Sequence, residues 1–171
     1  MTDLIQIWCD GSYREAHGTM GAGWVRAKED DTAPDARSEH SQRLPKLQHA
    51  HGHGSDIAEL TAFALALRSL HAQAHVRVHM DCRNVIEWLT AAQVTTKSKR
   101  GEPAVMRAFN QAMEAKARLA QVTLKYCDDK YSPHMKLAHI LSRAASNPGK
   151  DAPRKKGPRH AHQNSQRSAR P

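Results

Sequence analysis

Three carboxylates stand in sequence contexts that would allow them to meet in one site. Asp10 ends the apolar run 5–9, Asp81 ends a second apolar run, 76–80, and Glu59 lies early in an amphipathic segment. Two acids at strand ends and one in the first turns of a helix meet only if the fold brings these elements together. Hard divalent cations stabilise such closely packed negative charge, because they bind carboxylate oxygens. The three acids therefore indicate metal-assisted phosphodiester chemistry.

The elements that must position these acids follow from hydrophobic periodicity and from turn residues. The pattern predicts strands at 4–10, 24–27, about 39–50, 76–81 and 122–126, with helices beginning near 55, 84, 103 and 133. Short connections join the first three strands and favour an antiparallel meander, whereas helices separate the later strands and favour parallel additions. The expected fold is α/β: a five-stranded mixed sheet with helices on both faces.

Glycine and proline set the expected boundaries of these elements. Gly18, Gly21 and Gly23 are expected to form a turn before the second strand. Pro45 places the third strand at a sheet edge, where a missing backbone donor is tolerated. The basic segment 97–101 is expected to be a loop.

Two helix starts carry capping residues in the sequence. Ser55 or Asp56 is expected to cap the helix that holds Glu59, and Asp56 also favours the positive end of the helix dipole. Ser132 followed by Pro133 is typical of a cap and of a first helical position, and it predicts a final helix to about Ser146.

The basic charge is concentrated at the end of the chain. Residues 147–171 contain no large apolar residue and carry seven Lys and Arg against one Asp, which is +6 of the net charge of +9. We expect a folded domain at 1–146 and a disordered basic tail at 147–171. Such a tail holds a polyanion electrostatically and is expected to contact a nucleic-acid backbone. A merely solubilising tail is the alternative.

Cysteine usage and hydropathy indicate a reduced compartment. The three cysteines, Cys9, Cys82 and Cys127, are odd in number, lack metal-ligand spacing and are interpreted as small apolar residues. No hydrophobic stretch approaches about 18 residues, and no signal peptide is recognisable. We expect a cytoplasmic monomer without membrane contact.

A histidine cluster stands apart from the acids. His49, His51 and His53 alternate, so they would share one face of an extended segment and could bind Ni²⁺ or Zn²⁺. They also precede a segment expected to contact substrate, where protonated histidines would meet phosphate. With no further ligand nearby in sequence, an ordinary surface loop is the favoured interpretation.

The chain resembles the ribonuclease H type 1 family over about residues 4–146. The resemblance rests on four motifs whose order, spacing and expected elements match together: Asp10-Gly11-Ser12, Ala58-Glu59-Leu60, Met80-Asp81-Cys82-Arg83-Asn84-Val85 and Leu137-Ala138-His139-Ile140-Leu141-Ser142-Arg143-Ala144-Ala145. It implies hydrolysis of the RNA strand of RNA/DNA hybrids with two Mg²⁺ ions held by four acids. Asp10, Glu59 and Asp81 correspond to three of these acids, with Asp10 expected to bridge the ions.

The fourth acid of the family is missing, and His139 occupies its position. If His139 is a catalytic and metal-binding residue, its neutral imidazole gives the site one negative charge fewer than the acid of the family would. It would weaken Mg²⁺ binding and favour Mn²⁺ as an alternative ion. An ordinary exposed histidine is the other interpretation. The family also commonly has a loop histidine before this helix; Asp129 is nearest that position, His134 falls too late, and neither is assigned.

The resemblance further implies a set of substrate contacts. The segment that precedes the Glu59 helix matches a region that contacts ribose 2′-hydroxyls, which distinguish RNA from DNA. The residues expected to bind substrate are Ser12, Tyr13, Ser55, Asp56, Cys82, Arg83 and Asn84. The basic protrusion of some relatives is short here, and it leaves Lys97, Lys99 and Arg100 to touch phosphate.

Two alternatives to a hybrid-cleaving endonuclease remain open. A non-catalytic nucleic-acid-binding module on the same fold is one, because His139 breaks the acidic quartet and a fold alone does not prove activity. A 3′→5′ exonuclease of related fold is the other. That group usually has a second carboxylate two residues after the first, whereas Ser12 stands two residues after Asp10.

Overall fold

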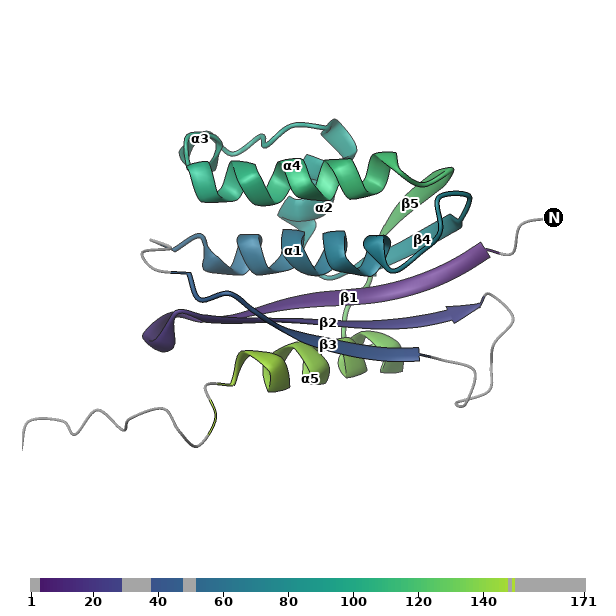
Figure 1. The fold of residues 1–171 in the computed structure, drawn as a ribbon, viewed down its shortest axis with the longest axis horizontal. Helices are drawn as coiled ribbons and strands as arrows, with labels where there is room; N and C mark the ends of the chain where they lie inside the picture. The colour runs from purple at the N-terminus through teal and green to yellow at the C-terminus, as the bar shows by residue number, and fades with distance from the viewer. Residues whose placement is uncertain (1–3, 29–37, 48–51, 148, 150–171) are drawn as a thin grey trace, which may run out of the picture.

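The computed structural model describes residues 4–28, 38–47, 52–147 and 149, and a single five-stranded sheet is central to it (Figure 1). The elements are β1 (Leu4–Arg14), the 3-10 turn η1 (Glu15–His17), β2 (Thr19–Lys28), β3 (Ser38–Leu44), α1 (Gly54–Arg68), β4 (His75–Met80), α2 (Arg83–Ala91), α3 (Lys97–Arg100), α4 (Pro103–Ala117), β5 (Gln121–Tyr126) and α5 (Pro133–Ser146).

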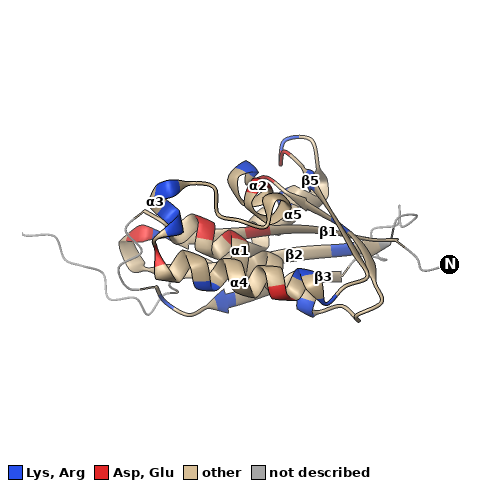
Figure 2. Cartoon of the chain, turned by 90° about the horizontal axis from the view of Figure 1, so that it is seen from above, with Lys and Arg blue, Asp and Glu red and all other residues tan. Residues whose placement is uncertain are grey.

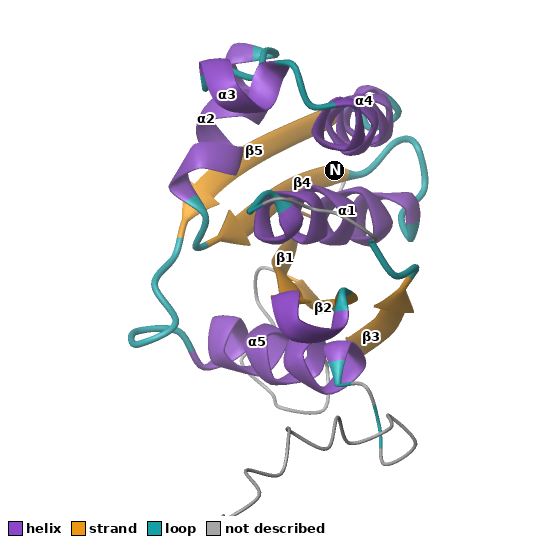
Figure 3. Ribbon diagram, turned by 90° about the vertical axis from the view of Figure 1, so that its left-hand side faces the viewer, coloured by secondary structure: helices purple, strands orange, loops and turns teal. Residues whose placement is uncertain are grey.

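The strand order β3-β2-β1-β4-β5 confirms the expected mixed sheet. β1, β2 and β3 pair antiparallel as a meander, while β4 joins β1 and β5 joins β4 in parallel. Helices α1 and α4 cover one face of the sheet, and α5 covers the other (Figure 3). The predicted architecture, a five-stranded mixed α/β sheet with helices on both faces, is therefore correct.

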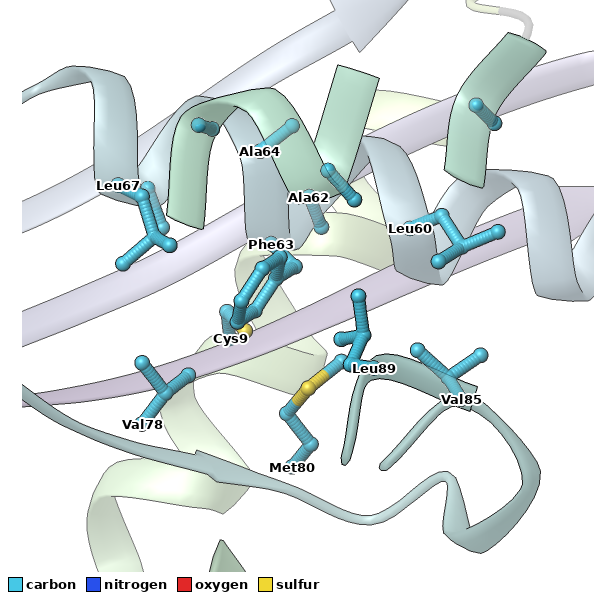
Figure 4. Close-up of a cluster of buried hydrophobic side chains, with 14 of the residues drawn as sticks. Cys9, Leu60, Ala62, Phe63, Ala64, Leu67, Val78, Met80, Val85 and Leu89 are labelled. Atoms are coloured by element: carbon cyan, nitrogen blue, oxygen red, sulfur yellow. The ribbon is translucent and has the colours of Figure 1, made fainter. Parts of the chain in front are cut away.

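The larger core lies between the sheet and α1. In β4, buried and half-buried residues alternate along the strand, so Val78 and Met80 point into this core. Phe63 and Leu60 of α1 fill the space above them, and Figure 4 shows Phe63 beside Cys9 of β1. Each such side chain contributes about 1.5–3 kcal/mol when fully buried, so this layer holds α1 firmly on β1.

A smaller core fixes α5 on the opposite face. Trp8, Val25 and Ala27 of the sheet pack there against Met135 and Ala138 of α5. The helix begins as predicted, because the Ser132 hydroxyl accepts a hydrogen bond from the Met135 N–H at 3.2 Å and proline occupies the first turn. The packing and the cap together determine which face of α5 meets the sheet.

The glycines of the second strand correct one expectation. Only Gly18 forms a turn, with a left-handed φ of 62°, whereas Gly21 and Gly23 lie inside β2. The reason is close packing: a Cβ on Gly23 would collide with the Ala138 carbonyl oxygen of α5, and one on Gly21 with that of Ser142. These glycines serve the approach of a helix far away in sequence, which local pattern does not reveal.

Three further boundaries differ from expectation. β3 ends at Leu44, so Pro45 follows the strand, although β3 is indeed at the sheet edge. Residues 97–100 form the short helix α3, not a loop. Helix α1 begins at Gly54 with His53 at its cap position, so Ser55 and Asp56 lie within the first turn and cap nothing.

Two expectations fall outside the described part of the chain. The basic tail, apart from residues 147 and 149, and His49 with His51 are not described, so these stay predictions. In the described ranges, no helix is both long enough and apolar enough to cross a membrane.

Replacing Gly23 with Ala tests the packing of α5 on β2. We expect a loss of about 2–4 kcal/mol in the free energy of unfolding, because the added methyl meets helix backbone that has no room to move. Urea denaturation measures it. Gly101→Ala is the control, since nothing lies within 4 Å of its added Cβ. Equal stability losses in the two variants would contradict the packing argument.

Candidate metal centre

Asp10 and Asp81 are brought together by the parallel pairing of β1 with β4. The described pairing ends with Trp8 opposite His79, so Asp10 and Asp81 stand two residues further on along both chains. The sequence predicted that the first strand ends at Asp10. In the structure β1 continues to Arg14, paired with β2, so Asp10 lies inside the strand. It stands instead where the neighbouring β4 ends. Asp10 is only 3% exposed.

Glu59 reaches the same place from α1. A Cβ on Gly11 would collide with the backbone of Ala58 and Glu59, so glycine after Asp10 allows α1 to cross β1 in contact. The Gly11 N–H donates a hydrogen bond to the Glu59 carboxylate. Glu59 is 7% exposed, and its Oε2 has no hydrogen-bond partner in the described structure. We call Asp10, Glu59 and Asp81 the three-acid cluster.

His139 joins this cluster from α5. Its Nδ1 lies 3.4 Å from Asp10 Oδ1 and 3.7 Å from Asp81 Oδ2, and the side chain is only 18% exposed. These are ion-pair distances for a protonated ring, but the Nδ1 atom makes no hydrogen bond within the described residues. The alternative of an ordinary exposed histidine is therefore wrong: the ring faces two carboxylates.

Ser142 is a site residue that sequence reasoning missed. Its hydroxyl donates a hydrogen bond to Asp10 Oδ2, and the residue is fully buried. It stands three residues after His139, on the same side of α5. The sequence does place a serine three residues after His139 on a predicted helix. Serine is too common on helices for this spacing alone to predict a site residue.

The side chains suit a hard divalent cation. Ligand atoms of Asp10, Asp81 and His139 all lie within 4.8 Å of one another. Glu59 is not part of that group, but its buried, unpartnered Oε2 is a donor of the same chemistry. Carboxylate oxygens with one imidazole match Mg²⁺ and Mn²⁺ better than softer ions.

Burial raises the pKa of every acid in the cluster, and repulsion from other carboxylates adds to this effect. Burial lifts the pKa of Asp10 to about 6, against the lowering effects of the Ser142 hydrogen bond and His139. The pKa of Glu59 is raised well above its usual value, first by burial and then by Asp10 and Asp81. Burial also raises the pKa of Asp81. Without a metal, the three carboxyl groups therefore lose their protons less readily than free carboxyl groups do.

The residues near α1 that are expected to contact substrate differ in exposure and in their partners within the protein. Ser12 accepts a hydrogen bond from the Ser146 hydroxyl at 3.0 Å, and Tyr13 is half-buried with its ring against Gly54. Ser55 is exposed, whereas Asp56 is buried and ion-paired with Lys99. Asp56 is therefore occupied by a lysine in this structure, and its contact with substrate stays a prediction.

The contacts expected after β4 remain accessible in part. Cys82 is half-buried and packs against the core, while Arg83 and Asn84 are exposed at the start of α2. The Arg83 guanidinium lies 4.0 Å from the centre of the Tyr126 ring, a cation–π arrangement that holds it at the edge of the sheet. Their role in substrate binding is likewise a prediction.

The basic residues of α3 are mostly engaged with the protein. Lys99 pairs with Asp56 and also lies 5.4 Å from the centre of the Trp88 ring, and the Arg100 Nε donates to the Val94 carbonyl at 3.0 Å. Figure 2 shows this basic helix at one end of the α1–α4 layer. Lys99 and Arg100 are thus engaged within the protein, although the sequence analysis expected Lys97, Lys99 and Arg100 all to contact phosphate.

The loop candidates differ in position. His134 stacks on the Trp8 ring with centroids 4.3 Å apart, so the ring belongs to the small core under α5. Asp128 and Asp129 lie close enough to Asp81 to raise its pKa. Of the two residues considered from the sequence for this loop, Asp129 and not His134 acts electrostatically on Asp81.

Asp10→Asn tests the electrostatic strain of the metal-free site. A raised carboxyl pKa means that the folded protein binds the proton more tightly, so stability falls as the pH rises from about 4 to about 6. The variant has no such penalty. With a chelator present, we expect it to be about 1–3 kcal/mol more stable than the wild type at pH 7.5 and equally stable at pH 3.5.

Thermal or urea unfolding at the two pH values measures this difference. Ser142 retains an acceptor in the variant, because the asparagine amide oxygen replaces the carboxylate oxygen. A variant that is less stable than the wild type at pH 7.5 would contradict the account.

Comparisons with known proteins agree with this geometry. A family model described as RNase H matches residues 2–134, a stretch that includes Asp10, Glu59 and Asp81 but stops before His139. No curated protein matches the chain significantly.

Solved structures share the fold at low identity. The N-terminal RNase H domain of rv2228c from Mycobacterium tuberculosis, solved as a fusion with maltose binding protein, has a TM-score of 0.65 at 17% identity, over 85% of this chain and 94% of that one. RNase H1 from the halophilic archaeon Halobacterium salinarum has a TM-score of 0.65 at 18% identity, over 83% and 96%. LC11-RNase H1 in complex with an RNA/DNA hybrid has a TM-score of 0.64 at 20% identity, over 83% and 96%.

The structural likeness establishes the fold, and the match of the family model over most of the chain establishes the family. Both agree with the order of motifs around the three acids. The chain therefore belongs to the ribonuclease H family of enzymes, type 1.

Proposed function

We propose that this protein is a metal-dependent endonuclease that hydrolyses the RNA strand of RNA/DNA hybrids. The observation that carries the proposal is the meeting of Asp10, Asp81 and His139 within 4.8 Å, beside the buried Glu59. Nucleic-acid binding alone does not require three carboxylates, because they repel phosphate. The hybrid-bound LC11-RNase H1 of the same fold supports this choice of substrate.

Two Mg²⁺ ions, or Mn²⁺ ions, bound there would supply an activated water and charge neutralisation at the scissile phosphate. Asp10 and Asp81 would hold them from the sheet, Glu59 from α1 and His139 from α5. Ser142 fixes the Asp10 carboxylate by its hydrogen bond and leaves the other oxygen, Oδ1, toward His139. The pre-set positions of these side chains reduce the cost of organising the site.

Selection of the RNA strand requires contact with the ribose 2′-hydroxyl. The exposed Ser55 at the start of α1 and the exposed Asn84 at the start of α2 are suited to this contact, since both lie a few residues from an acid of the cluster. Arg83, held over Tyr126, is suited to a backbone phosphate. Ser12, Tyr13, Asp56 and Cys82 remain part of the proposed substrate surface.

The second candidate is a hybrid-binding module of weak or absent activity. One observation favours it, namely that a histidine stands where the resemblance implies an acid. Against it, the His139 ring is directed at Asp10 and Asp81, as a metal ligand would be. An exonuclease has no comparable support in the site.

Cleavage of a labelled hybrid tests the proposed function. We expect cuts within the RNA strand in the presence of Mg²⁺ or Mn²⁺, with at least a hundredfold loss in Asp10→Asn, because one carboxylate of the metal site is removed. Single-stranded RNA and duplex DNA of the same sequence are the substrate controls. Glu114→Gln on α4, which removes an exposed acid paired with Arg68, is the control variant.

Salt-sensitive binding of the hybrid without cleavage by either metal would instead favour the binding module. Cuts confined to a 3′ end would favour the exonuclease.

His139→Asp tests the effect of the imidazole on metal preference. A fourth carboxylate strengthens the attraction for a hard cation, so we expect the Mg²⁺ concentration for half-maximal cleavage to fall by about tenfold, and that for Mn²⁺ to fall less. His139→Ala is the companion variant and should raise both concentrations. Unchanged metal requirements in all three proteins would show that residue 139 is not a ligand.

A further inference from the structure

A hydrogen-bonded row of serines connects the three-acid cluster with the last residue of β1. Side chains alternate along a strand, so Asp10, Ser12 and Arg14 lie on one face of β1, the face that α5 covers. Ser142 donates to Asp10, and one turn later the buried Ser146 hydroxyl donates to Ser12 at 3.0 Å. The Arg14 Nε donates in turn to Ser146 Oγ at 3.3 Å. These contacts fix the position of the Arg14 side chain relative to the metal-binding residues.

A second arginine flanks the same end of α5. β2 lies between β1 and β3, and the end of α5 rests on Gly21 of β2, where a Cβ would collide with helix backbone. From β1, the Arg14 Nη2 donates to the Arg143 carbonyl at 3.5 Å. From β3, the Arg43 Nη2 donates to the Asn147 carbonyl. The two guanidinium groups therefore come from strands about 10 Å apart and lie on either side of the helix end.

These contacts orient the two guanidinium groups without cancelling their charge. Both side chains are exposed, and among the described residues their partners are hydroxyl and carbonyl oxygens, with no carboxylate at ion-pair distance. Lys99, by contrast, is paired with Asp56. A guanidinium carries five N–H donors in a planar fork, so donors remain free for an anion. Oriented arginines of this kind bind phosphate groups with two parallel hydrogen bonds.

The proposed reaction needs positive charge away from the metal centre. Three carboxylates repel a nucleic-acid backbone, so cations elsewhere on the surface must supply the attraction. Arg14 lies four residues along β1 from Asp10, about 13 Å in an extended strand, and so can meet a phosphate other than the one that is cut. The predicted basic tail follows Asn147 in the sequence and thus starts beside Arg43.

We propose that Arg14 and Arg43 bind the sugar-phosphate backbone of the RNA/DNA hybrid beside the metal centre. They form a substrate-binding surface on β1 and β3, separate from the residues at the starts of α1 and α2. The inference rests on the proposed function and adds to it the place where the backbone is held.

Hybrid binding by the full chain, measured over a series of salt concentrations with a chelator present, tests this inference. We expect Arg14→Met to raise Kd by about fivefold and to reduce the slope of log Kd against log salt concentration by about 1, because one phosphate contact is lost. Arg43→Met should act in the same way. Arg14→Lys should retain the slope, since lysine keeps the charge.

Arg118→Met is the matched control. Arg118 is also an exposed arginine at a helix C-terminus, where it favours the helix dipole. It lies just before β5, at the end of that strand opposite the Tyr126 that pairs with Met80 beside the metal centre. The control variant should therefore bind the hybrid with an unchanged Kd and an unchanged salt slope. Thermal unfolding of each variant measures any contribution to helix stability separately.

Two further readouts locate the contact. In a series of hybrids with single phosphates replaced by uncharged methylphosphonates, one position away from the cut should weaken binding by the wild type but not by Arg14→Met, because that variant already lacks the contact. In cleavage assays, KM should rise in Arg14→Met and Arg43→Met while kcat stays within about twofold of the wild type, since substrate binding alone is weakened.

The outcomes distinguish this inference from the function on which it rests. Wild-type protein that binds the hybrid, with an unchanged Kd and salt slope in Arg14→Met and Arg43→Met, would overturn the inference and leave the nuclease proposal standing. An equal loss in Arg118→Met would also contradict it, because net charge alone would then account for the effect. Binding that depends on both arginines, without cleavage by either metal, would support the inference and overturn the nuclease proposal. Wild-type protein that does not bind the hybrid would overturn both.

Discussion

The burial of neighbouring carboxylates is the constraint on which this structure depends. Asp10 and Glu59 are each more than nine-tenths buried, and Asp81 is adjacent. Such a group costs several kcal/mol of folding free energy unless protons or cations compensate it. Burial is the first cause of the raised pKa of each of the three acids. A divalent cation relieves it, so the feature that weakens the metal-free fold is the one that gives the site its affinity.

The rest of the fold supplies rigid supports for this unfavourable arrangement. The parallel register of β1 and β4 sets Asp10 beside Asp81, and Gly11 lets α1 approach until Glu59 reaches them. On the other face, Gly23 allows the backbone of α5 to rest on β2, which places His139 and Ser142 over Asp10. Each support belongs to a different pair of elements, so no single local segment could hold the site alone.

The sequence indicated which acids would lie together because each stood in a recognisable element, Asp10 and Asp81 after apolar runs and Glu59 in a predicted helix. The helix was expected to be amphipathic, but α1 is buried around most of its surface. The catalytic roles of the acids stay predictions. The sequence-based prediction failed for residues whose role depends on a contact with a residue distant in the chain. Gly21 and Gly23 resemble turn glycines, yet they serve the approach of α5. Ser142 is an ordinary polar residue until the fold places its hydroxyl against the Asp10 carboxylate. The assignment of Ser55 or Asp56 as a cap failed because the cap position is His53, two residues before Ser55, and because Asp56 pairs with Lys99.

The most direct test of the central claim is anomalous diffraction from crystals of the protein grown with Mn²⁺. The account predicts a strong anomalous peak within bonding distance of Asp10, Asp81 and His139, with the Glu59 carboxylate directed at the metal centre. Crystals that diffract well at saturating Mn²⁺ but show no peak among these residues would contradict it. The three acids would then lie together without a cation, and the proposed chemistry would have no basis.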